Sequence, residues 1–125
     1  MKKTILVIDD DATDLKKIVT TLEREGYTVM EATGVDEAMN KAQQTMPNLV
    51  IADVVFPETT GFDICRKIKA TFQPRPPLVL MVTGKAAAVN VPLATKMGAD
   101  GFEAKTSDMS HVVKAVRNIL AHNNN

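Results

Sequence analysis

The stretch NLVIADVVFPETTG, residues 48–61, decides the fold. Residues 49–52 form a short apolar run with Pro47 before it and Pro57 after it, as expected for a strand buried on both faces. Asp53 closes this run. Groups at the carboxyl ends of strands in an open parallel sheet point into the crevice where ligands bind, which makes Asp53 a candidate reactive acid. Aspartate is also common in turns after strands, so this position alone leaves a structural role open.

The composition fits one soluble globular domain of 125 residues, 45% of them hydrophobic. Fifteen acidic and fifteen basic residues give zero formal net charge, so the sequence indicates no general attraction to nucleic acid or to an anionic membrane surface. No apolar run is long enough to span a bilayer, and the run after the basic start is too short for a signal peptide. A single cysteine, Cys65, cannot form an internal disulfide, so we expect a cytoplasmic protein.

Apolar runs alternate with segments of helical periodicity along the whole chain. We expect strands near residues 4–8, 27–32, 49–52, 78–82 and 100–104, each followed by a helix. The second strand alternates between apolar and polar residues, so we place it nearer an edge of the sheet. Five strand–helix units without a repeat signature predict an α/β fold with a parallel sheet and helices on both faces.

The fourth helix and the chain end are harder to assign. Proline would break a helix interior, so we expect this helix to begin near Pro92, at a boundary one or two residues earlier, with residues 85–89 in an extended loop or frayed turn. Cys65 falls on the inner face of the third helix, so we place it in the core. We expect one domain over residues 1–121 and a disordered tail over residues 122–125.

Polar side chains follow four of the predicted strands. With the strand order 2-1-3-4-5, Asp9, Asp10 and Asp53 meet at the carboxyl ends of the first and third strands. Three carboxylates repel one another, so a cation should join them or at least one should have a raised pKa. Mg²⁺ suits an open acidic pocket, because it prefers oxygen ligands and keeps several waters. Thr83 and Lys105 end two further strands and offer a hydroxyl and an ammonium group to a phosphoryl group.

These residues, with Pro57 and Gly61 after the third strand, resemble the motif set of response-regulator receiver domains of two-component signal transduction, and the chemotaxis-regulator type in particular. The resemblance covers about residues 3–120. It implies the flavodoxin-like doubly wound (βα)5 fold, a three-layer sandwich with a parallel sheet in the order 2-1-3-4-5.

The resemblance also implies a role for each site residue. Asp53 matches the phosphoacceptor, Lys105 the lysine that pairs with the phosphoryl group, and Thr83 the switch hydroxyl. Phe102 matches the switch aromatic. The implied ligands of Mg²⁺ are three carboxylates and one backbone carbonyl, from Asp9, Asp10, Asp53 and Val55.

The function implied by the resemblance is phosphorylation of Asp53 by a histidine kinase, a phosphotransfer protein or a small phosphodonor, with Mg²⁺ as cofactor. Thr83 would then move inward and Phe102 would fill the vacated space, changing the surface made by the fourth helix, fifth strand and fifth helix. That surface would bind a downstream protein. We therefore expect a monomer or weak homodimer that binds neither nucleic acid nor membrane, and that is no enzyme beyond its own phosphorylation and dephosphorylation.

Two departures from the family pattern affect the expected chemistry. Thr106 stands where most receivers have a proline joined by a cis peptide bond, so the loop around Lys105 either keeps that geometry at a cost or is trans. Val55 and Lys85 occupy the positions that tune loss of the phosphoryl group. Because the apolar Val55 side chain cannot assist an attacking water, we expect slower hydrolysis than with a polar residue there.

Three other classes of protein share part of this pattern. Thr106 leaves open a receiver-like interaction module that is not phosphorylated. An FMN-binding flavodoxin needs a phosphate-cradling loop after the first strand, where this chain has three acids that would repel phosphate. A haloacid-dehalogenase-type phosphatase needs a second aspartate two residues after its nucleophile; Asp53 is followed there by Val55, although Asp9 and Asp11 have that spacing.

Overall fold

The computed structural model describes residues 2–84 and 90–122. Within these residues the backbone forms a five-stranded sheet in the order β2-β1-β3-β4-β5, and each neighbouring pair is parallel. The strands are β1 Thr4–Ile8, β2 Thr28–Ala32, β3 Leu49–Asp53, β4 Leu78–Thr83 and β5 Gly101–Ala104. The predicted fold class, strand order and edge position of the second strand are confirmed.

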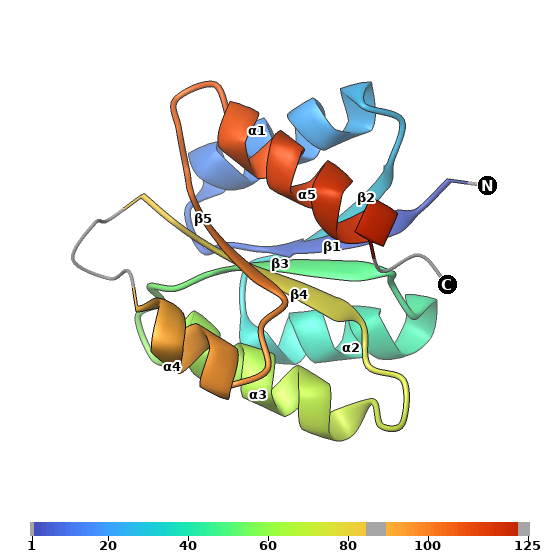
Figure 1. Cartoon of the computed structure of the whole chain (residues 1–125), viewed down its shortest axis with the longest axis vertical. Coiled ribbons are helices and arrows are strands. Elements are labelled where there is room, and N and C mark those ends of the chain that lie inside the picture. Colours follow the sequence, from blue (N-terminus) through green and yellow to red (C-terminus); the bar gives the residue numbers. More distant parts are fainter. Residues whose placement is uncertain (1, 85–89, 123–125) are drawn as a thin grey trace.

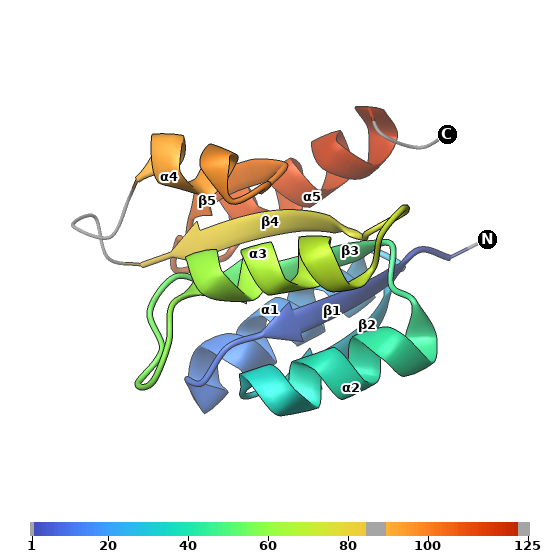
Figure 2. The ribbon, with the colours of Figure 1, turned by 90° about the horizontal axis from the view of Figure 1, so that it is seen from below.

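Helices cover both faces of the sheet and complete the three-layer sandwich. Figure 1 shows α1 and α5 on one face and α2, α3 and α4 on the other, and Figure 2 shows the second group from its own side. The helices are α1 Ala12–Arg24, α2 Val35–Thr45, α3 Gly61–Thr71, α4 Val91–Lys96 and α5 Ser110–His122. None of the helices among the described residues has the length and apolar character needed to cross a bilayer.

The central strands are buried on both faces because successive side chains point to opposite sides of the sheet. In β3, Leu49 and Ile51 join the core cluster under α1 and α5, whereas Val50 and Ala52 join the cluster under α2, α3 and α4. Cys65 of α3 is 0% exposed in the second of these clusters. The prediction that this cysteine belongs to the core is therefore correct.

The start of α4 agrees with the expectation from Pro92. Asn90 is the N-cap, its side chain accepts a hydrogen bond of 3.1 Å from the backbone N–H of Leu93, and the proline lies in the first turn, where no intrahelical donor is lost. Residues 85–89, for which a loop or frayed turn was expected, lie outside the described residues.

The C-terminal helix extends further than expected. His122, which the sequence places in a disordered tail, is the last residue of α5, and its Nδ1 atom lies 2.7 Å from the carbonyl oxygen of Asn118. The hydrophobic stripe of α5 stops at Leu120, so apolar periodicity gave no sign of this last turn. Residues 123–125 of the expected tail lie outside the described residues.

Candidate functional site

The parallel ladder brings the polar strand ends to one edge of the sheet. Ile8 pairs with both Ala32 and Ala52, so Asp9 follows β1 beside the end of β3. The backbone N–H of Lys105 donates to the carbonyl of Thr83 at 3.0 Å, which extends the pairing of β4 with β5 by one residue. Strand register thus places groups from four strands in one region, as the sequence predicted.

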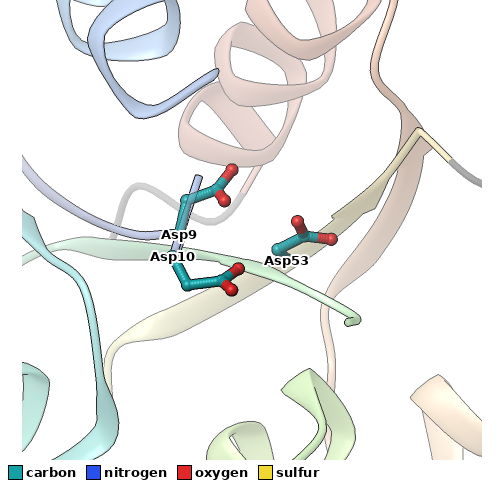
Figure 3. A group of neighbouring side chains, drawn as sticks. All are labelled: Asp9, Asp10 and Asp53. Carbon is teal, nitrogen blue, oxygen red and sulfur yellow. The ribbon is translucent and has the colours of Figure 1, made fainter. Parts of the chain in front are cut away.

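Asp9, Asp10 and Asp53 form the acidic part of this region. Each contributes one carboxylate oxygen to a set in which all the oxygens lie within 4.8 Å of one another. Figure 3 shows the three side chains extending from the neighbouring ends of β1 and β3. Asp9 is 1% exposed and Asp53 8%, whereas Asp10 is exposed to solvent. Hard oxygen donors with one open side suit a divalent cation.

Lys105 supplies the positive charge of the site. Its Nζ atom lies 2.8 Å from Oδ2 of Asp9, 2.9 Å from Oδ2 of Asp14 and 3.0 Å from Oδ2 of Asp53. The lysine side chain is only 7% exposed. A nearly buried ammonium needs such partners, because a charge removed from water without compensation is costly.

The electrostatics of the pair Asp9 and Lys105 follow from this burial. Burial raises the pKa of Asp9, and the hydrogen bonds from Lys105 and from the Asp11 backbone N–H only partly oppose it. Burial alone would lower the pKa of Lys105, but hydrogen bonds to its three carboxylates outweigh burial and raise it. A raised carboxyl pKa was expected, although its main cause is burial rather than repulsion by Asp53.

An open pocket of about 600 Å³ gives access to these groups. Asp53 and Thr83 line it from the ends of β3 and β4, Lys105 lines it from just after β5, and Val55 lines it from the loop after β3. Thr83 is 2% exposed, whereas Val55 is 37% exposed. The expected phosphate-contacting groups are thus brought together around one solvent-accessible space. Lys85, expected to tune phosphoryl loss, lies outside the described residues.

The loop after β3 holds Asp53 through a close backbone contact with α3. Thr60 caps α3 by accepting a hydrogen bond of 3.2 Å from the backbone N–H of Asp63. The next residue, Gly61, lies so close to the strand end that an added Cβ would overlap the Asp53 carbonyl oxygen and come within 2.6 Å of Met81 Cε. Glycine is therefore required here by the approach of two backbones.

Phe102 lies on β5 beside Met81 of β4 and packs, half-buried, against the core cluster under α2, α3 and α4. Its ring contacts that of Phe62 at a centroid distance of 6.3 Å and an interplanar angle of 47°. This tilted geometry is favourable for an aromatic pair. The candidate switch aromatic thus faces the start of α3, close to Gly61.

The loop after Lys105 has trans geometry at Thr106, since the cis peptide bonds among the described residues are limited to Gln73–Pro74. Thr106 Oγ1 donates to Oδ1 of Asp108 at 3.1 Å, and the same oxygen accepts from the Ser110 backbone N–H at 3.0 Å. The Lys105 ammonium reaches both Asp9 and Asp53 from this loop. A proline in place of Thr106 is therefore not needed for that contact.

Asp14 is the site residue that sequence reasoning missed. It lies in the first turn of α1, lines the pocket and contacts Lys105. The available signal was an acid in the first turn of the helix that directly follows the strand-end acids. Local sequence alone did not reveal that this acid contacts a lysine 91 residues further along the chain.

Comparison with known proteins supports one family. The response regulator receiver domain family matches residues 5–117. The alkaline phosphatase synthesis transcriptional regulatory protein PhoP of Bacillus subtilis is 32% identical over 120 residues, which cover 96% of this chain and 49% of PhoP. The DNA-binding response regulator MtrA of Mycobacterium tuberculosis is 32% identical over 123 residues, covering 98% of this chain and 53% of MtrA. The chain thus spans about half the length of these relatives.

The fold of this chain is also similar to that of a response regulator of known structure. The chemotaxis response regulator CheY4 of Vibrio cholerae superposes with a TM-score of 0.85 at 26% sequence identity, over 96% of this chain and all of CheY4. The family match, the strand order and the acidic strand ends agree with one another. This chain belongs to the response regulator receiver domain family.

Proposed function

We propose that this receiver domain accepts a phosphoryl group on Asp53 from a histidine kinase, a phosphotransfer protein or a small phosphodonor. The observation that carries the proposal is the position of the Asp53 carboxylate, 3.0 Å from the Lys105 ammonium, in a pocket that Thr83 also lines. A nucleophilic carboxylate beside a fixed cation and a hydroxyl is the arrangement that phosphoryl transfer requires.

The residues Asp9, Asp10 and Asp53 would hold Mg²⁺, since their carboxylate oxygens approach within 4.8 Å and one side of the group is open to water. When bound, the ion supplies positive charge that offsets the charge of the transferred oxygens. The Val55 carbonyl is proposed as a further ligand, because Val55 lines the same pocket.

In the proposed step, a carboxylate oxygen of Asp53 forms a bond to the phosphorus of the donor. The bond from phosphorus to the histidine nitrogen, or to the acetate oxygen of acetyl phosphate, breaks and leaves its electron pair on that atom. Lys105 neutralises charge on the transferred oxygens, and the Thr83 hydroxyl donates to one of them. The product is an acyl phosphate on Asp53, which water can hydrolyse.

The readout of phosphorylation would be the surface formed by α4, β5 and α5. Movement of Thr83 toward the phosphoryl group would leave space next to β5, and Phe102 would fill it, since it is half-buried on the strand that pairs with β4. Phosphorylation then shifts the population between two packings and changes what a downstream protein contacts. This mode of action makes the domain a regulatory protein.

Intact-mass spectrometry tests the proposal. The protein is incubated with acetyl phosphate and Mg²⁺, beside an Asp53→Ala variant and a sample with chelator. We expect a gain of one phosphoryl group that requires both Asp53 and Mg²⁺. A folded protein that binds Mg²⁺ and gains no phosphoryl group would contradict the proposal and favour an interaction module that is not phosphorylated.

A further inference from the structure

The acid that the family motifs do not include, Asp14, is part of the ion-pair network of the site. Its Oδ2 atom lies 2.9 Å from Lys105 Nζ, between the distances of the contacts made by Asp9, 2.8 Å, and Asp53, 3.0 Å. Asp14 also lines the pocket that Asp53 and Lys105 share. An acid that only stabilised the N-terminus of its own helix would not have to contact Lys105 or line this pocket.

The ammonium of Lys105 has three N–H donors, and the described residues supply three carboxylate acceptors for them, from Asp9, Asp14 and Asp53. All three donors are therefore engaged before phosphorylation. A phosphoryl group on Asp53 adds oxygens that need the same ammonium, so at least one present contact has to weaken.

The contact with Asp14 is the one that can be released at least cost. The Asp9 side chain is 1% exposed, so without Lys105 its charge would be left in the protein interior. One oxygen of Asp53 would carry the phosphoryl group itself. The Asp14 side chain is 35% exposed and lies on the first turn of a helix, where water and the helix N-terminus stabilise a free carboxylate.

We propose that Asp14 is a positioning residue of the phosphoryl-transfer site. In the unphosphorylated domain it accepts one hydrogen bond from Lys105 and offsets part of the positive charge of that lysine, and it thereby opposes phosphorylation of Asp53. This inference rests on the proposed function. Its physical basis is electrostatic, because a cation in contact with three carboxylates attracts an incoming anion less strongly than the same cation in contact with two.

The test compares Asp14→Asn with Glu23→Gln, which removes one negative charge from an exposed position further along the same helix without contact to Lys105. Phosphorylation by acetyl phosphate at saturating Mg²⁺ is followed by intact mass. We expect Asp14→Asn to raise the rate constant by about threefold to tenfold, in keeping with a half-exposed ion pair. Glu23→Gln should leave the rate constant unchanged, and Asp14→Glu should restore a rate near that of the wild type.

A second readout separates positioning from a purely structural role. The side-chain ¹H–¹⁵N signal of the Lys105 ammonium, assigned by its loss in Lys105→Ala, should shift in Asp14→Asn and stay in place in Glu23→Gln. Acceleration without this shift would show that Asp14 does not act through Lys105 and would overturn the inference.

The remaining outcomes distinguish the inference from the proposed function. Equal rate constants in Asp14→Asn and the wild type overturn the inference and leave phosphorylation of Asp53 standing. Absence of phosphorylation in every variant overturns both.

Discussion

The Nζ atom of Lys105 lies 2.8 Å from Oδ2 of Asp9, a residue 96 positions earlier in the chain. This ion pair joins the loop after β5 to the end of β1, and it lies almost entirely out of contact with water. The stability of the domain and the chemistry of the site therefore depend on the same contact.

Replacement Lys105→Ala should lower the free energy of unfolding by about 3 kcal/mol, since it leaves the buried Asp9 carboxylate without its cation. Chemical denaturation with and without Mg²⁺ measures the effect, and we expect Mg²⁺ to restore part of the loss. Lys114→Ala, which removes the same charge from an exposed position on α5, should change stability by less than about 0.5 kcal/mol. Similar losses in the two variants would contradict the structural importance of the buried pair.

Replacement Gly61→Ala should displace the end of β3, because the added Cβ would overlap the Asp53 carbonyl oxygen. We expect a loss of about 2 kcal/mol or more in unfolding free energy and slower phosphorylation by acetyl phosphate. Gly84→Ala is the matched control for stability, since a Cβ there meets no atom within 4 Å. A Gly61→Ala variant as stable as Gly84→Ala would show that the strand end adjusts freely.

The aromatic pair Phe62 and Phe102 predicts a spectroscopic signature of the switch. The chain has four phenylalanines, so ¹⁹F NMR of protein labelled with fluorophenylalanine should give four signals that Phe→Leu variants assign. Phosphorylation should shift the signals of Phe62 and Phe102, whose rings are in contact. Phe72, which lines a separate pocket beyond the other end of α3, should shift least. A shift confined to rings other than Phe102 would contradict its role in the switch.

Replacement Val55→Asn should speed loss of the phosphoryl group by about threefold to tenfold, because an amide at this exposed pocket position can orient an attacking water, whereas valine cannot. The decay of the phosphorylated mass after removal of the donor measures the rate. Met46→Asn introduces the same amide at an exposed apolar position outside this pocket and should leave the decay unchanged. The hypothesis is wrong if Val55→Asn decays at the rate of the wild type.

Cys65 predicts a pH dependence of stability in the alkaline range. Burial raises the pKa of its thiol from 9.0 to about 11, so between these values the folded state keeps a proton that the unfolded state has lost. This contribution to stability is fully present below pH 9 and declines as the pH rises toward 11. Compared with Cys65→Ala, the wild type should lose roughly 2 kcal/mol between pH 8 and pH 11. Parallel curves of unfolding free energy for the two proteins would contradict this.

The layered architecture and the main site residues could be predicted from the sequence. Local periodicity identifies the strands and helices, because burying an apolar face sets the spacing of apolar residues in each element. The apolar run ending at Asp53 marks a strand buried on both faces, and the carboxyl ends of such strands meet at one edge. Pro92 likewise indicated the start of α4.

Only the tertiary structure decided which side chains meet within the site. The contact of Asp14 with Lys105 and the ring contact of Phe62 with Phe102 each join segments far apart in the chain, and the overlap that makes Gly61 necessary arises where α3 packs against the end of β3. Local periodicity specifies the face of an element but not its partner on another element. Those partners depend on strand order and on how each helix lies across the sheet, which the whole core fixes together.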